Sequence, residues 1–142
     1  VNILEILIRT LKFDENRWNL FKTFLHFLLD VKGLNGRKSL VSLLTLLADS
    51  RPDLNQPMEL LAKMNEKAKG LLESEFDFDK KIDAINLIND DYMTQWTFDQ
   101  LEPVLYQFLY EMNCDELAVR NIAATGLKSF IENTADSRNF YG

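Results

Sequence analysis

The chain has 142 residues, of which 46% are apolar, and it contains ten phenylalanines but only five glycines and three prolines. This composition fits one folded domain with a core, and it argues against a disordered chain or a β fold with many turns. A single cysteine excludes an intramolecular disulfide and favours a reducing intracellular compartment.

The formal net charge of −6 is distributed unevenly along the chain. Residues 73–116 contain 12 acidic and two basic side chains, whereas residues 1–72 contain eight acidic and 11 basic side chains. Two explanations of the acidic middle segment remain open: a solvated outer face, or a binding site for a basic partner. Because the chain is acidic and its basic residues come in ones and twos, only weak direct contact with RNA phosphates is predicted.

Apolar residues at helical spacing predict seven helices and no strand of useful length. The first helix covers about residues 3–12. Its short length and the charges at Glu5, Arg9 and Lys12 indicate a buried helix rather than a membrane span. The sequence starts at Val1 and the helical pattern follows almost at once, so we expect a piece of a longer protein.

Asp14 is a suitable cap for a second helix that extends to about Leu29 and is apolar on most of its circumference. A helix of that kind is expected to be buried on several sides. The motif GLNGRK, residues 33–38, predicts a turn, and a third helix follows at about residues 39–48. Two prolines in the motif DSRPDLNQP then break the helical pattern.

A fourth helix is predicted from Met58 to Leu72, and the stretch FDFDKK, residues 76–81, follows it. Asp79 is the predicted N-cap of the next helix. Phe78 is spaced to share one face with isoleucines four and seven residues later, so we expect it to be buried. The two lysines of the stretch are then expected to point outward.

The motif TFDQ, residues 97–100, has the spacing of a capping box. A helix that began at Thr97 would place Pro103 in its interior, where proline removes a hydrogen bond. The main helix is therefore predicted to begin near Pro103, after a short turn. The last helix is predicted at about residues 115–133.

These last two helices, LEPVLYQFLYEMNCDELAVRNIAATGLKSFIE, resemble a HEAT repeat. That family pairs an amphipathic helix, often with an early proline, with a second helix marked by Asp, Val-Arg and a small residue. The matching positions here are Pro103, Asp115, Val119, Arg120 and Ala123. The resemblance implies an all-α fold, an α-solenoid of stacked antiparallel helix pairs (HEAT/armadillo-like) with about seven helices. Arg120 is expected to be structural, with Asp115 or an acid of the neighbouring layer as its partner.

The domain organisation follows from these predicted helices. Residues 1–142 are expected to form a single helical-repeat segment. Within it, residues 1–50 would make the first helical layers, residues 57–90 the connector helices, and residues 97–134 the HEAT-like pair.

A second resemblance covers about residues 60–132. It rests on Met64-Asn65, Asp-Phe-Asp-Lys-Lys at 77–81, Ile88-Asn89, and Glu-Leu-Ala-Val-Arg at 116–120. This pattern is similar to the DRIM family (small nucleolar RNA-associated protein 20), very large HEAT/armadillo-type nucleolar proteins of the small-subunit processome. The family pattern has two arginines where this chain has lysines, and a leucine in place of the methionine. Since lysine lacks the planar fork of arginine, no bidentate contact to phosphate or carboxylate is expected there.

Residues with catalytic chemistry are few. His26 is the only histidine, and its apolar surroundings predict a core or interface role. Cys114 has no histidine near it in the sequence and is predicted to be an inert, half-buried thiol. Asp90 and Asp91 precede a loop, where acids usually cap the chain or face solvent. No motif for a zinc site, a nucleotide or a nucleophile is present, so we expect neither a cofactor nor an enzyme.

Two functions fit the sequence. The resemblance implies a non-catalytic scaffold segment of a large HEAT-repeat nucleolar protein that supports pre-rRNA processing and small ribosomal subunit assembly. Its partners would be other proteins of a large ribonucleoprotein assembly, with weak or indirect RNA contact, no membrane and no small-molecule substrate. The alternative is a HEAT-like adaptor that binds a basic peptide through the acidic middle segment. The candidate partner contacts are Arg37, Lys38, Lys80 and Lys81, and the structural positions are Phe78, Asp79, Pro103, Asp115, Val119 and Arg120.

Overall fold

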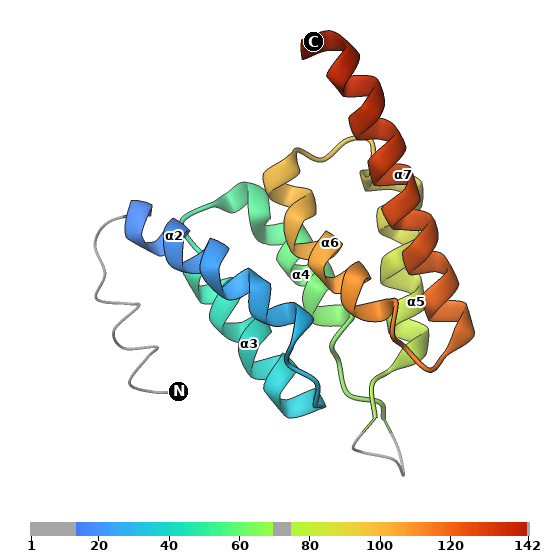
Figure 1. Cartoon of the computed structure of the whole chain (residues 1–142). Helices are drawn as coiled ribbons and strands as arrows, with labels where there is room; N and C mark the ends of the chain where they lie inside the picture. Colours follow the sequence, from blue (N-terminus) through green and yellow to red (C-terminus); the bar gives the residue numbers. More distant parts are fainter. Residues whose placement is uncertain (1–13, 70–74, 142) are drawn as a thin grey trace.

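The computed structural model describes residues 14–69 and 75–141, and these residues are helical apart from their connections (Figure 1). The all-α prediction is therefore confirmed for this part of the chain, while the helix predicted at residues 3–12 lies outside it. No helix in the described ranges is both long and apolar enough to cross a membrane. The elements are α2 (Asp14–Leu25), the 3-10 turn η1 (His26–Leu29), α3 (Leu34–Leu47), the 3-10 turn η2 (Pro52–Leu54), α4 (Asn55–Lys63), α5 (Phe78–Leu87), the π-helical turn η3 (Ile88–Tyr92), α6 (Phe98–Glu111) and α7 (Leu117–Tyr141).

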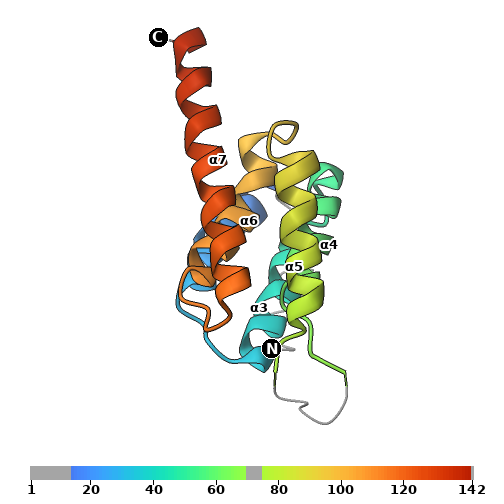
Figure 2. The same cartoon turned by 90° about the vertical axis from the view of Figure 1, so that its right-hand side faces the viewer.

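The helices form antiparallel pairs that stack on one another. In Figures 1 and 2, α4 and α5 run in opposite directions, and so do α6 and α7. Across the two pairs, α4 packs on α6 and α5 packs on α7. The third pair, α2 with α3, lies against the first through α3 and α4, and η1 reaches α6. This packing is compatible with two successive repeats of an α-solenoid, and the solenoid itself stays a prediction.

The core lies between these layers and is built from the apolar face of each helix. Phe21, Leu44, Leu61, Ile85 and Phe108 come from five different helices, and each is fully buried. Helix α7 contributes Val119 and Ala123, as the HEAT-like pattern predicts for a small residue on the inner face. Helices α2 to α6 are only 9 to 14 residues long, so their stability depends on burial of these faces more than on helix propensity.

The predicted turn at residues 33–38 is wrong, because α3 begins at Leu34 and includes most of that motif. Leu34 and Arg37 are three residues apart, and both are buried on the inner face of the helix. Gly36 lies in the first turn, where a Cβ would come within 3.0 Å of the Val31 side chain. Glycine and asparagine suggested a turn, but tertiary contacts on the buried face outweighed their weak local preference.

The fourth helix is shorter than predicted. It spans Asn55–Lys63, starts before the predicted Met58, and is followed by a turn at Met64 rather than continuing toward Leu72. Lys67 then pairs with Phe76 in an isolated antiparallel bridge, supported by hydrogen bonds from the Ala68 amide to the Glu75 carbonyl and from the Asp77 amide to the Glu66 carbonyl. The periodic leucines beyond this point, Leu71 and Leu72, lie outside the described residues.

The predicted start of α6 near Pro103 is also wrong. Thr97 caps the helix and forms a full capping box with Gln100, so that helix α6 begins at Phe98 and Pro103 lies inside it. Proline at this position leaves the Asp99 carbonyl without its helical donor, but the Pro103 ring is buried in the core. The cap and this burial together compensate for one lost hydrogen bond.

Helix α7 comes unusually close to its neighbours at Gly126. A Cβ at this position would lie 2.5 Å from Cε2 of Phe108 on α6 and 2.5 Å from Oδ1 of Asn89 on η3. Asn89 in turn donates a hydrogen bond to the Ile122 carbonyl of α7, at 3.0 Å. Glycine is therefore required by the distance between α6, α7 and η3, and not by backbone conformation.

We expect Gly126→Ala to destabilise the chain by about 1–2 kcal/mol. The methyl group would overlap a buried aromatic ring, which costs about 1–3 kcal/mol, and the better helix propensity of alanine returns up to about 1 kcal/mol. Urea unfolding of the 142-residue chain measures this difference. Thr125→Ala, at the exposed neighbouring position, is the control and should leave the unfolding midpoint unchanged or slightly raised. A Gly126→Ala chain as stable as the parent would mean that the α6–α7 distance is adjustable.

Candidate functional site

The guanidinium of Arg37 is fully buried and joins four parts of the fold. Its Nη1 donates to the Leu28 carbonyl at 2.8 Å and to the Val31 carbonyl at 2.6 Å, so it caps the end of η1. Its Nε donates to Oδ1 of Asn65 at 2.7 Å, and its Nη2 donates to Oε1 of Gln107 at 2.7 Å. The predicted role of Arg37 as a partner contact is therefore wrong, because its donors are used inside the protein.

The groups around this guanidinium complete a buried polar junction. The Asn65 amide nitrogen donates to the Leu61 carbonyl at 2.9 Å and to Oε1 of Gln107 at 3.0 Å. The Tyr110 ring lies under the guanidinium, with 3.4 Å between its centroid and the Arg37 carbon Cζ. Burial lowers the pKa of Arg37, and Tyr110 and Glu111 oppose that shift; the guanidinium nevertheless remains charged at neutral pH.

A second buried cation lies beside this junction. The Lys81 side chain is 1% exposed and the Glu111 side chain 0%, and Nζ of Lys81 lies 3.1 Å from Oε1 and 2.8 Å from Oε2 of Glu111. The rings of Phe76 and Phe78 surround the ammonium, with centroids at 4.2 and 5.6 Å. Burial raises the pKa of the Glu111 carboxyl, and the nearby Lys81 ammonium opposes this shift. The prediction that Lys81 points outward is wrong.

The stretch FDFDKK is thus a connector that inserts one of its two lysines into the core. Asp77, and not the predicted Asp79, is the N-cap of α5, because its side chain accepts the Lys80 amide at 3.1 Å. Asp79 is exposed in the first turn, and Phe78 is half-buried against the core. Lys80 is 40% exposed and forms an ion pair with Glu66, which is 39% exposed. One turn of helix therefore contains both a surface lysine and a buried lysine.

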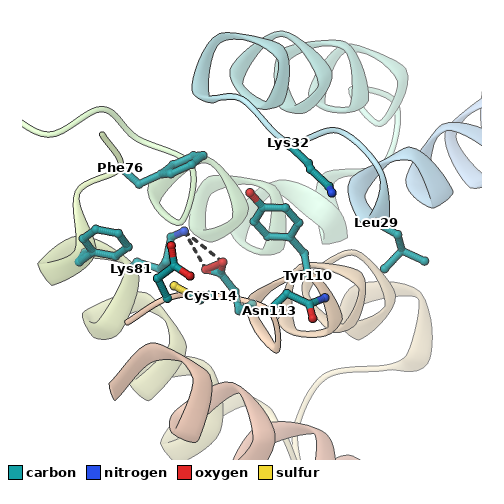
Figure 3. Close-up of a pocket in the computed structure, with 10 residues that line it drawn as sticks. Leu29, Lys32, Phe76, Lys81, Tyr110, Asn113 and Cys114 are labelled. Atoms are coloured by element: carbon teal, nitrogen blue, oxygen red, sulfur yellow. Dashed lines mark hydrogen bonds and ion pairs between the residues drawn. The ribbon is translucent and has the colours of Figure 1, made fainter. Parts of the chain in front are cut away.

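A pocket of about 350 Å³ opens above the Lys81–Glu111 pair (Figure 3). Figure 3 shows Phe76 and Tyr110 on either side of the pair, with Lys32 extending toward Tyr110 from the opposite wall. The formal charges of its lining sum to zero, because it contains two lysines, Lys32 and Lys81, and two acids, Glu111 and Asp115. The remaining lining residues are Leu29, Phe78, Asn113 and Cys114.

This pocket does not have the chemistry of an active site. Burial raises the pKa of the Cys114 thiol, which keeps it protonated and unreactive. Its buried acid and base, Glu111 and Lys81, are paired with each other, and aromatic rings lie around the ammonium. Within residues 14–69 and 75–141, no group of three His, Cys, Asp or Glu side chains is arranged to hold a metal ion.

The other predicted positions lie where the helical pattern placed them, with two differences. Val119 is fully buried, Asp115 and Lys38 are exposed, and Arg120 is half-buried. Arg120 donates to the Cys114 carbonyl at 3.2 Å, so its partner in the described structure is the turn before α7, and not the predicted acid. His26 is exposed and contacts the Tyr106 hydroxyl at 3.1 Å, so it is not a core residue.

The residues that complete the buried junction were not predicted from the sequence, although the spacing of two of them is informative. Gln107 and Glu111 are four residues apart on α6, on the same face as Val104 and Phe108. Polar side chains at a core spacing predict a buried polar contact. The partners of these groups come from residues 28–81, so only the tertiary structure identifies them.

Replacement of Arg37 by methionine should destabilise the chain by about 3 kcal/mol or more. The change removes a donor from two carbonyls and two amide oxygens, and within the described residues only Oε1 of Gln107 keeps another donor, the Asn65 amide. Each unsatisfied buried group costs about 1–3 kcal/mol. Chemical denaturation gives the magnitude. Lys38→Met on the neighbouring exposed position should leave the midpoint almost unchanged. Equal effects of the two changes would contradict the structural role of Arg37.

Lys81 and Lys80 should respond differently to the same change. Lys81→Met leaves the Glu111 carboxylate alone in the core and should cost about 3–5 kcal/mol, whereas Lys80→Met removes only a solvent-exposed pair. The double variant Lys81→Met/Glu111→Leu should recover most of the loss, because no lone charge remains. Unfolding midpoints of the three variants test this. A double variant as unstable as Lys81→Met would show that the lone carboxylate is not the cause of the loss.

Comparison with known proteins agrees with the DRIM resemblance. The matching family is described as U3 small nucleolar RNA-associated protein 20, N-terminal, and the match covers residues 1–141. The chain is 28% identical over 140 residues to U3 small nucleolar RNA-associated protein 20 of Schizosaccharomyces pombe, an alignment that covers 92% of this chain and 6% of that relative. No solved structure matches the chain. Since the family match spans nearly the whole sequence, the chain belongs to the N-terminal family of U3 small nucleolar RNA-associated protein 20.

Proposed function

We propose that this chain is a non-catalytic scaffold segment of a large nucleolar protein that supports pre-rRNA processing within the small-subunit processome. The observation that carries the proposal is the family match over residues 1–141. The fission yeast relative is named for its association with U3 small nucleolar RNA, and this chain spans 6% of the length of that relative. The partners of the segment would be other proteins of a large ribonucleoprotein assembly.

The architecture supports a scaffold role. Stacked helix pairs such as α4–α5 and α6–α7 build extended surfaces from short units, which suits a protein that holds others in place. The buried charges at Arg37, Lys81 and Glu111 are used to join helices, and the only thiol has a raised pKa. These features favour binding over catalysis.

The adaptor alternative, in which the acidic middle segment binds a basic peptide, has less support. Glu111 is buried with Lys81, and Asp77 caps α5. Asp99 lies 3.3 Å from Arg51, and Glu102 pairs with Lys22. These four of the 12 acids of residues 73–116 therefore already have partners within the fold.

The test uses the full-length parent protein in cells. Deletion of the region that corresponds to residues 14–141 should reduce its co-sedimentation with pre-ribosomal particles and U3 RNA, and unprocessed rRNA precursors should accumulate. Cys114→Ser combined with His26→Ala removes the only thiol and the only imidazole of this segment. That variant should sediment and process rRNA like the parent.

Two results would contradict the scaffold proposal. A deletion that leaves both sedimentation and rRNA processing unchanged would show that the segment is dispensable for assembly. A folded, particle-bound Cys114→Ser/His26→Ala variant that fails to process precursors would instead indicate catalysis by the segment.

A further inference from the structure

Two shallow depressions lie next to each other on the surface formed by α3, α4 and α5. The first, between α3 and the end of α4, is lined by Lys38, Val41, Ser42, Ala62, Asn65, Glu66 and Lys67. The second, between α4 and α5, is lined by Leu60, Lys63, Glu66, Lys80, Asp83, Ala84 and Leu87. Glu66 belongs to both linings, so the two depressions adjoin at this residue, and we call them together the lysine groove.

The lysine groove carries the opposite charge to the chain as a whole. Lys38, Lys63, Lys67 and Lys80 are drawn from three separate parts of the sequence and line it together with two acids, Glu66 and Asp83. Glu66 is already paired with Lys80. Within the described ranges, no carboxylate forms an ion pair with Lys38 or Lys63, one of which lies in each depression. The chain has a net charge of −6, yet this surface has an excess of cations.

The floor of the lysine groove is partly apolar. Val41 and Ala62 line the first depression, and Leu60, Ala84 and Leu87 line the second. Leu87 is 36% exposed, although most large apolar side chains of these helices are buried. An apolar floor with a cationic rim fits a ligand that has apolar side chains on one face and carboxylates beside them.

We propose that the lysine groove binds an acidic, amphipathic segment of a partner protein. Its apolar side chains would occupy the two depressions, and its carboxylates would face Lys38 in one and Lys63 in the other. The inference deepens the proposed scaffold role and rests on it, because it names the chemistry of one protein partner. The charge of this partner is opposite to that in the adaptor alternative, in which the segment would bind a basic peptide.

A nucleic acid fits this surface less well than a protein does. Neither depression is lined by an aromatic side chain on which a base could stack. All four cations are lysines, so none provides the bidentate fork that arginine offers to phosphate. The apolar floor would also contribute nothing to a phosphate backbone.

Site-specific photo-crosslinking of the full-length protein tests the inference. Benzoyl-phenylalanine replaces Ser42 in one variant and Leu87 in another, so that one probe lies in each depression; exposed Asn121 on α7 is the control position. The particle-bound fraction is irradiated, and the adducts are treated with nuclease and sequenced by mass spectrometry. We expect nuclease-resistant adducts at both groove positions with the same protein segment, one that has a net negative charge and contains apolar residues.

Charge reversal supplies the second measurement. Lys38→Glu with Lys63→Glu should reduce the yield of these adducts about tenfold or more, because like charges would then face each other. Lys32→Glu with Lys128→Glu makes the same change of net charge at positions outside the lysine groove and should not alter the yield. The neutral variant Lys38→Gln/Lys63→Gln should give an intermediate yield. Such a graded response to charge distinguishes lost attraction from a misfolded chain.

Nuclease-sensitive adducts would show that RNA occupies the groove and would overturn the inference. Adducts with a basic or neutral segment, yields equal to those at Asn121, or equal loss in both charge-reversal variants would overturn it as well. A parent protein that co-sediments with particles but gives such results leaves the scaffold role intact. A parent protein that does not co-sediment removes the scaffold role and this inference together.

Discussion

The arrangement of the helices depends on one buried guanidinium. Arg37 extends from α3 and donates to the carbonyls at the end of η1, to Asn65 beyond α4 and to Gln107 on α6. A single side chain therefore joins residues in or next to η1, α3, α4 and α6. A buried cation without hydrogen bonds would be very costly, and this one is satisfied only when all of these elements are in place. Apolar helix faces tolerate sliding, but this network does not. We therefore infer that Arg37 favours one register of helix packing, in addition to its contribution to stability.

The Lys81–Glu111 pair extends the same principle to the last layers. It joins the first turn of α5 to the end of α6, beside the Tyr110 ring that stacks under Arg37. Gln107, Tyr110 and Glu111 are three polar or amphipathic residues on one helix, and each contacts a cation from another helix. Helix α6 is thus the common partner of both buried cations. A solenoid repeat that must stack in one orientation gains specificity from such contacts.

The same two cations show why the sequence does not reveal which basic residues lie at the surface. Arg37 and Lys81, two of the four candidate basic residues, are buried in the core. Their sequence neighbours Lys38 and Lys80 remain at the surface. The surface lysines of α3, α4 and α5 then meet around Glu66. An acidic chain can therefore present a cationic surface, because folding separates charges that are adjacent in sequence and gathers charges that are distant.

The sequence by itself determined the helical class, the helix pair of α6 and α7, and the family. These follow from local information: apolar spacing for the helices, and the Asp, Val-Arg and small-residue pattern for α7, where Val119 and Ala123 are buried as expected. Tertiary structure alone decided the first turn of α3, the early end of α4, and which lysine of FDFDKK is buried. Those outcomes depend on partners 28 to 70 residues away, such as Asn65 and Gln107 for Arg37. Helical periodicity places a side chain on a face, but only the packing of the helices shows what that face meets.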